Sequence, residues 1–257
     1  MMCVLITRPR KDASEFALAL AKIGAEAVFL PTIDIHPVAD TTLIDQAISH
    51  LRDYDWLIFT SANAADVVLD RKTALGIDRF PENLRIAAIG PKTVARLLDG
   101  GVTPNFIPDE YKAEAILPGL GELNGRWALL PMADIAHNTL PHAIQKANGI
   151  AHVVTAYHTL LAEPDPVGLA AIYDGVDVIT FTSGSTARNF VKLLEHAGLD
   201  PFHLSGDPKI ACIGPKTAKT VKELGFSVDI VASTYTVDGL VRAIASHFRK
   251  THPHEAI

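Results

Sequence analysis

Residues 57–65 read LIFTSANAA, and residues 179–187 read ITFTSGSTA. A second pair of segments, IAAIGPKT at 86–93 and IACIGPKT at 210–217, differs at one position in eight. The members of the two pairs lie 122 and 124 residues apart. Because a solenoid needs more copies of a shorter unit, this internal repeat predicts two related α/β units.

Each copy of the repeat contains uncharged apolar segments that are followed by amphipathic ones. Trp56–Thr60 precedes an expected helix at Ala62–Leu69, and Ile86–Ile89 precedes one at Lys92–Leu98. The other expected strands are Cys3–Thr7, Ala128–Leu130, Val178–Thr182 and Ile210–Ile213. Uncharged strands that are each followed by a helix are typical of parallel strands buried in a doubly wound sheet. We therefore predict an α/β protein with two doubly wound parallel sheets.

Composition and charge narrow the class of protein. Of the 257 residues, 48% are hydrophobic and 20% are charged, which excludes a disordered chain. No apolar run is long enough to predict a membrane span, and the charges from Arg8 onward make the first apolar segment a strand rather than a secretory signal. The net charge of -6 argues against a nucleic-acid partner. Cys3 and Cys212 are too few for a disulfide framework, so we expect a cytoplasmic location.

Pairs of hydroxyl residues follow two of the expected strands at equivalent places. Thr60-Ser61 follows the apolar residues Leu57–Phe59, and Thr182-Ser183 follows their counterpart in the repeat. In parallel sheets, ligands bind beyond the carboxyl ends of the strands. A hydroxyl there caps the next helix, and the same helix end can bind a carboxylate or phosphate. Capping alone and ligand binding both remain open, but the repetition favours a ligand role for at least one pair.

A Gly-Pro-Lys-Thr turn follows two further strands, at 90–93 and 214–217. Glycine permits a close backbone approach or an unusual dihedral angle, and proline suits the first position of a helix. The spacing of a P-loop is missing, and no GxGxxG motif occurs, so we expect no nucleotide cofactor. We expect no metal site either, because the eleven histidines form no HExxH or similar cluster.

Arg8 lies directly after the first expected strand. Its guanidinium could bind a carboxylate through two hydrogen bonds, although an ordinary exposed arginine explains the position equally well. The equivalent place in the second unit holds Pro131-Met132, so a site that used Arg8 would be asymmetric.

Several segments, taken together and in order, resemble the uroporphyrinogen-III synthase family. They are Thr7-Arg8-Pro9, LIFTSANAA, IAAIGPKT, VVTAYHT at 153–159, ITFTSGSTARNF at 179–190, IACIGPKT and TYTVDGL at 234–240. The resemblance implies two α/β lobes joined by a two-stranded connector, with residues 1–34 and 161–257 in one lobe and 35–160 in the other. Two linker candidates that contain proline, Pro31–Pro37 and Tyr157–Pro166, fit that division.

The resemblance also implies an activity: a monomeric, cofactor-free lyase of haem, sirohaem or cobalamin biosynthesis. It would cyclise hydroxymethylbilane, a linear tetrapyrrole, to uroporphyrinogen III with loss of water and inversion of ring D. Tyr157 occupies the place of the family's tyrosine and is the expected catalytic acid, with supporting packing as the alternative. The residues implied to bind the substrate are Arg8, Thr60, Ser61, Gly90, Thr93, Thr182, Ser183, Gly184, Gly214 and Thr217.

One loop departs from the family pattern. Residues 131–139 contain no Lys or Arg, whereas many family members have basic residues there; His137 and Asn138 are the polar substitutes. Two other functions therefore stay open. One is a two-lobed module that binds a small anion, as solute-binding proteins do. The other is a catalytically degenerate synthase-like domain with a regulatory role.

Overall fold

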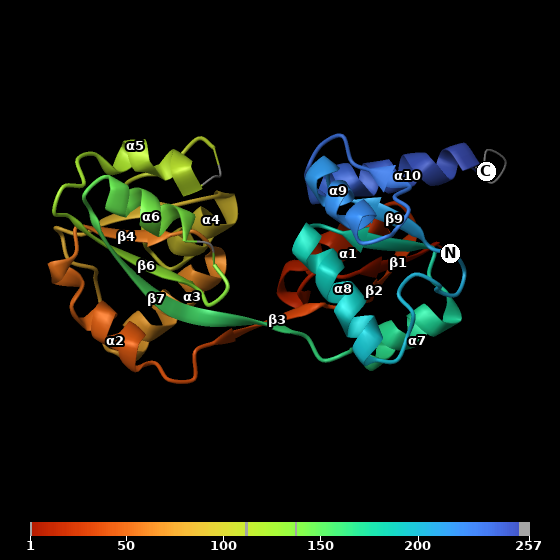
Figure 1. Cartoon of the computed structure of the whole chain (residues 1–257), viewed down its shortest axis with the longest axis horizontal. Coiled ribbons are helices and arrows are strands. Elements are labelled where there is room, and N and C mark those ends of the chain that lie inside the picture. The colour runs from red at the N-terminus through yellow and green to blue at the C-terminus, as the bar shows by residue number, and fades with distance from the viewer. Residues whose placement is uncertain (1, 111–112, 137, 252–257) are drawn as a thin grey trace. The chain divides into compact units, whose positions relative to one another are not determined.

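The computed structural model describes residues 2–110, 113–136 and 138–251, so that His137 lies outside the described residues. The chain divides into two compact units. Unit 1 comprises Met1–Asp34 and Leu160–Ile257, and unit 2 comprises Ile35–Thr159. Figure 1 shows the red N-terminal and blue C-terminal segments together in unit 1. Leu160 thus belongs to unit 1, one residue from the boundary expected from the sequence.

Unit 1 is built on a sheet with the strand order β10-β9-β8-β1-β2, in which all neighbouring strands are parallel. Its strands are β1 (Met2–Ile6), β2 (Ala25–Phe29), β8 (Val178–Phe181), β9 (Lys209–Cys212) and β10 (Ile230–Val231). Its helices are α1 (Ser14–Ala21), α7 (Pro166–Asp174), α8 (Gly184–His196), α9 (Pro215–Glu223) and α10 (Val237–Thr251), with a 3-10 turn at Arg10–Asp12.

Unit 2 is built on a sheet with the order β3-β7-β6-β4-β5. Its strands are β3 (Ile33–Pro37), β4 (Trp56–Phe59), β5 (Arg85–Ala88), β6 (Trp127–Ala133) and β7 (Ile150–Leu161). Its helices are α2 (Thr42–Ser49), α3 (Ala62–Ala74), α4 (Pro91–Asp99), α5 (Leu117–Leu120) and α6 (Thr139–Lys146), with 3-10 turns at Leu51–Asp53 and Ala113–Ile116.

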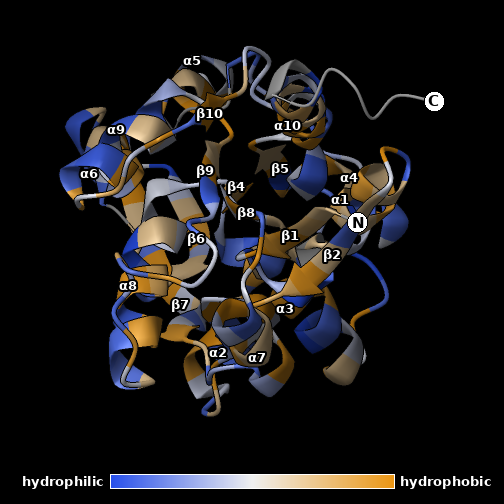
Figure 2. Ribbon diagram, turned by 90° about the vertical axis from the view of Figure 1, so that its right-hand side faces the viewer, coloured by the Kyte–Doolittle hydropathy of each residue, from blue (hydrophilic) through white to orange (hydrophobic). Residues whose placement is uncertain are grey.

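Both faces of each sheet are covered, as a doubly wound fold requires. In β1, Val4 and Ile6 pack with α1 and α10, whereas Leu5 between them packs with α7, α8 and α9. In β4, Phe59 packs with α2, α3 and α4, and Ile58 with α5 and α6. This alternation follows from the two-residue period of a strand. In Figure 2 the strands β1 and β2 carry hydrophobic colours, and the helices vary between hydrophobic and hydrophilic.

The two units repeat one topology. The order β9-β8-β1-β2 in unit 1 corresponds to β5-β4-β6-β7 in unit 2. A side-chain contact at the start of the central strands is repeated as well. Asp177 accepts a hydrogen bond from the Cys3 N–H at 2.6 Å, and Asp55 accepts one from the Trp127 N–H at 2.9 Å. The predicted fold, two doubly wound sheets related by internal duplication, is confirmed.

The chain passes from one unit to the other inside β3 and inside β7. These two segments are hydrogen-bonded neighbours. The Val38 N–H donates to the Ala156 carbonyl at 3.2 Å, and the Ala162 N–H donates to the Thr32 carbonyl at 3.3 Å, which is an antiparallel pattern. The two stretches expected as linkers therefore form much of a two-stranded connector rather than loops.

Candidate functional site

The carboxyl edge of each sheet, at which its parallel strands end, carries the N-termini of helices. Ser61 caps α3 by accepting a hydrogen bond from the Ala64 N–H at 3.1 Å. Ser183 caps α8 in the same way, accepting from the Thr186 N–H at 3.1 Å. Each serine thus satisfies one of the free backbone donors of its helix. In each hydroxyl pair it is the serine that caps the helix.

The two caps differ in what else they contact. The Ser61 Oγ lies 3.0 Å from the Tyr157 hydroxyl in β7. The Ser183 Oγ instead lies 2.9 Å from the Ser185 Oγ and 2.7 Å from the Thr186 Oγ1, both in its own first turn. Ser61 thus contacts the expected catalytic acid within unit 2.

The two Gly-Pro-Lys-Thr turns use glycine for different reasons. Gly90 precedes α4 with φ of 86° and ψ of 150°, a conformation that is essentially restricted to glycine. Gly214 precedes α9 in an extended conformation that any residue adopts. A Cβ on Gly214 would lie 3.0 Å from the Tyr235 ring, so this glycine permits a close approach. The two turns share a sequence motif, but the first needs glycine for its backbone conformation and the second needs it for a close approach.

The Gly90→Ala substitution is expected to lower the free energy of unfolding by about 1–3 kcal/mol, because the added Cβ makes this backbone conformation unfavourable. Urea denaturation of the variant and its parent measures the difference. Gly214→Ala strains no backbone dihedral, and removing the ring with Tyr235→Ala should recover most of its cost. A Gly90→Ala protein as stable as the parent would contradict this explanation.

The remaining expected substrate-binding residues also lie at the carboxyl edges. Thr60 and Thr182 follow β4 and β8 and are half-buried. Thr93 and Thr217, in the first turns of α4 and α9, are buried. Gly184 begins α8, where a Cβ would lie 2.8 Å from the Thr220 Oγ1, so the absence of a side chain lets α8 and α9 approach closely.

Arg8 follows β1 and is half-buried. Its Nε is buried and has no hydrogen-bond partner in the part of the chain that the structure describes. An unpaired buried donor is unfavourable, and it is more so on a charged group. The guanidinium therefore retains an unused donor at the carboxyl edge of unit 1.

Asp134 and His158 are two neighbours of Tyr157 that sequence reasoning did not select. The Asp134 Oδ2 lies 2.9 Å from the His158 Nδ1. The hydrogen bond from His158 is the largest cause that holds the pKa of Asp134 below its usual value, with backbone N–H donors adding to it. Asp134 is the single carboxylate within residues 131–139, and the sequence pattern of this loop carries no signal that selects it.

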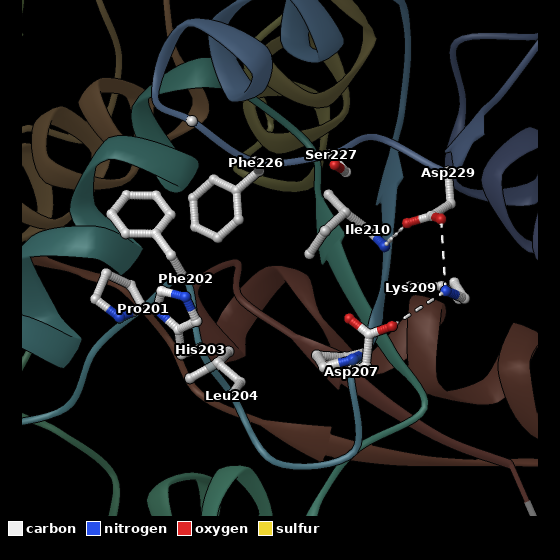
Figure 3. A pocket seen from close by; sticks show the side chains of 12 residues that line it. Pro201, Phe202, His203, Leu204, Asp207, Lys209, Ile210, Phe226, Ser227 and Asp229 are labelled. Atoms are coloured by element: carbon white, nitrogen blue, oxygen red, sulfur yellow. Dashed lines mark hydrogen bonds and ion pairs between the residues drawn. The ribbon is translucent and has the colours of Figure 1, made fainter.

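The cavity in Figure 3 lies at the end of the unit 1 sheet opposite the carboxyl edge, beside the start of β9. It has a volume of about 640 Å³, and Phe202 and Phe226 form part of its wall. Asp229 accepts a hydrogen bond from the Ile210 N–H at 2.9 Å and lies 3.7 Å from the Lys209 ammonium group. None of the expected site residues lines this cavity.

The described residues offer neither a metal site nor a membrane-spanning helix. Among them, no group of three or more His, Cys, Asp or Glu side chains is placed to hold a metal ion. No helix within residues 2–110, 113–136 and 138–251 has the length and apolar character that crossing a membrane requires. Burial raises the pKa of the Cys212 thiol to about 12, as befits a core residue rather than a nucleophile.

Comparisons with known proteins agree with one another. The family model for uroporphyrinogen-III synthase HemD matches residues 14–242. The uroporphyrinogen-III synthase of Synechococcus elongatus is 33% identical over 253 residues, which cover 96% of each chain. The putative uroporphyrinogen-III synthase of Methanocaldococcus jannaschii is 30% identical, over 95% of this chain and 98% of the relative.

Solved structures show the same fold. A mutant uroporphyrinogen III synthase from Thermus thermophilus matches with a TM-score of 0.65 and 19% identity, over 97% of this chain and 100% of that one. Uroporphyrinogen-III synthetase from Helicobacter pylori matches with a TM-score of 0.63 and 17% identity, over 96% and 99% of the two chains. The matches support the synthase interpretation and not an anion-binding module. The chain belongs to the uroporphyrinogen-III synthase family.

Proposed function

We propose that this protein converts hydroxymethylbilane to uroporphyrinogen III, as a lyase that eliminates water and closes the ring. The observation that carries the proposal is the Tyr157–Ser61 hydrogen bond at the carboxyl edge of a sheet, in a chain of this family. The atoms balance: the linear tetrapyrrole loses one hydroxyl group and one proton as water. Ring D is inverted because its substituted carbon first attacks the cation that forms when the hydroxyl group leaves. This attack gives a spiro intermediate.

Tyr157 is the proposed acid for the departure of the hydroxyl group. The electron pair of the adjacent pyrrole nitrogen expels this hydroxyl and leaves an azafulvene cation, so a weak acid is sufficient. A phenol can donate one hydrogen bond to the departing oxygen while it stays neutral. Ser61 Oγ is fixed by the Ala64 N–H and in turn holds the phenol oxygen. Ser61 therefore holds the phenol oxygen in one place.

The protein's larger task is to hold the flexible chain in the conformation that inverts ring D. Orientation of the reacting groups alone can supply much of the reduction in the activation barrier. We propose that the carboxylates of the substrate bind groups at the carboxyl ends of the strands. In unit 1, the unpaired Nε of Arg8 supports this role, together with Thr182, Ser183, Gly184, Gly214 and Thr217. In unit 2 the proposed groups are Thr60, Ser61, Gly90 and Thr93.

We also propose that the reaction needs no cofactor, because the pyrrole nitrogen itself supplies the electron pair that expels the leaving group. We propose a monomer that works in the cytoplasm, where Cys3 and Cys212, both free, stay reduced. Light scattering at working concentration tests the monomer directly.

The experiment that tests the function uses hydroxymethylbilane generated enzymatically and isomer analysis of the oxidised porphyrins. Uncatalysed closure gives the type I isomer. We expect the protein to give type III, and to do so in proportion to its concentration. Type I alone, at the uncatalysed rate, would contradict the proposed activity and favour a synthase-like domain without catalysis.

A further inference from the structure

A β-bulge in β7 determines where Tyr157 points. In the parallel pairing of β6 with β7, Met132 lies opposite Thr155, but the next residue, Ala133, lies opposite Tyr157. Ala156 is therefore an extra residue without a partner in β6. Bulges of this kind shift the side chains that follow them to the other face of the sheet.

Burial along β7 shows the effect of the bulge. Val154 and Ala156 are two residues apart and pack in the core beneath α2 and α3. Strict alternation would place His158 in this core and turn Tyr157 to the opposite face. Instead Tyr157 packs in the same core and is 7% exposed, whereas the His158 side chain is 43% exposed. The bulge exchanges the two positions and brings the phenol to Ser61, the N-cap of α3.

Asp134, the residue after Ala133, contacts three consecutive residues beyond the bulge. Its N–H donates to the Tyr157 carbonyl at 3.1 Å. Its Oδ2 lies 2.9 Å from the His158 Nδ1, and its Oδ1 accepts from the Thr159 N–H at 3.2 Å. The same Oδ1 accepts from the Ile135 N–H at 2.9 Å, which fixes the carboxylate on its own loop.

We propose that Asp134 is a positioning residue: through the carboxylate it fastens the β7 bulge in the register that directs Tyr157 at Ser61. The proposal rests on the proposed function, because it assigns Asp134 a part in catalysis through Tyr157. Asp134 itself touches no reacting atom. Its carboxylate holds His158 outside the core and the Thr159 N–H in place, so Tyr157 and not His158 occupies the inward position.

The Asp134→Ala substitution removes all of these side-chain contacts and leaves the backbone N–H to Tyr157 intact. We expect kcat to fall about tenfold, because a small misplacement of a catalytic group is costly, with KM changed less than about twofold. Asp200→Ala is the matched control. Asp200 also accepts from a backbone N–H, that of Phe202 at 2.9 Å, and lies 2.7 Å from a histidine Nδ1, that of His203, but it is in unit 1. Its loss should leave kcat unchanged.

Two further variants separate positioning from a charge or a purely structural role. Asp134→Asn keeps an oxygen for the Thr159 and Ile135 N–H groups and should recover most of the lost kcat. Combining Asp134→Ala with Tyr157→Phe should lower kcat no further than Tyr157→Phe alone, because both changes disable one group. The proposal would be overturned if the double variant lost kcat by the product of the two single losses. It would also be overturned if Asp134→Asn were as slow as Asp134→Ala.

A readout independent of activity distinguishes this proposal from the proposed function. With carbon-13 in the tyrosine rings, the Tyr157 resonance is assigned from the Tyr157→Phe spectrum. We expect Asp134→Ala to shift this resonance and Asp200→Ala to leave it in place. A shift in a protein that makes no type III isomer would uphold the positioning and refute the synthase activity. An unmoved resonance in Asp134→Ala would refute the positioning, whatever isomer forms.

Discussion

The Tyr157→Phe substitution is expected to lower kcat for hydroxymethylbilane about 100-fold, within the usual contribution of a general acid. The variant keeps the aromatic ring in the core beneath α3 and loses only the hydroxyl group that contacts Ser61. The loss of that hydrogen bond should lower the free energy of unfolding by about 1 kcal/mol. The effect on turnover is therefore much larger than the effect on folding. Initial rates and urea denaturation of the same preparation measure both.

Tyr54→Phe is a matched control for this experiment. Tyr54 is in the same core cluster, is also 7% exposed, and also makes a hydrogen bond through its hydroxyl, to the His152 Nδ1 at 2.6 Å. Tyr54 precedes the start of β4, whereas Ser61 follows the end of that strand. We expect it to lose a similar amount of stability and no turnover. Equal turnover in Tyr157→Phe and the parent would remove Tyr157 from the mechanism.

The Arg8→Met substitution is expected to raise KM for hydroxymethylbilane about ten- to hundredfold with little change in kcat. A charge-assisted hydrogen bond to a carboxylate contributes about 1.5–3 kcal/mol, which corresponds to that range. Methionine keeps much of the apolar stem. Because the Arg8 Nε has no partner in the described structure, its removal leaves no protein group unsatisfied. The free energy of unfolding should therefore stay the same or increase.

Arg126→Met is the control for the loss of a positive charge. Arg126 donates to the Asp55 Oδ1 at 2.7 Å, at the edge of the unit 2 sheet away from the proposed site. We expect it to leave KM unchanged. If Arg8→Met bound the substrate as well as the parent, or if both variants raised KM equally, Arg8 would not be a specific carboxylate ligand.

Much of the fold could be predicted because its signals are local and occur twice. The strands from Trp56 and Val178 are uncharged, fully buried on both faces and followed at once by a helix cap. Strand β2 was not predicted. Its residues Ala25–Phe29 include Glu26 and are only partly buried, because β2 pairs with β1 alone in the unit 1 sheet.

The candidate site was less predictable because its geometry depends on distant pairings. The serine caps follow from a few neighbouring residues, and the sequence repeats them. The contact between Ser61 and Tyr157 joins residues 96 positions apart. The bulge at Ala156 leaves no mark in the apolar pattern, since alternation alone would send Tyr157 to the other face. The proposed role of Asp134 depends on that bulge, so the sequence alone does not indicate it.

We propose that the conformation of the bound substrate selects the isomer, whereas the acid at Tyr157 only accelerates the loss of water. The most direct test is the isomer composition formed by Tyr157→Phe with the enzyme in excess over hydroxymethylbilane, so that the substrate is bound before it closes unaided. We expect slow formation of the type III isomer. Type I formed by the variant faster than in the absence of protein would contradict it, because the ring would then close on the enzyme without the inversion that binding is meant to impose.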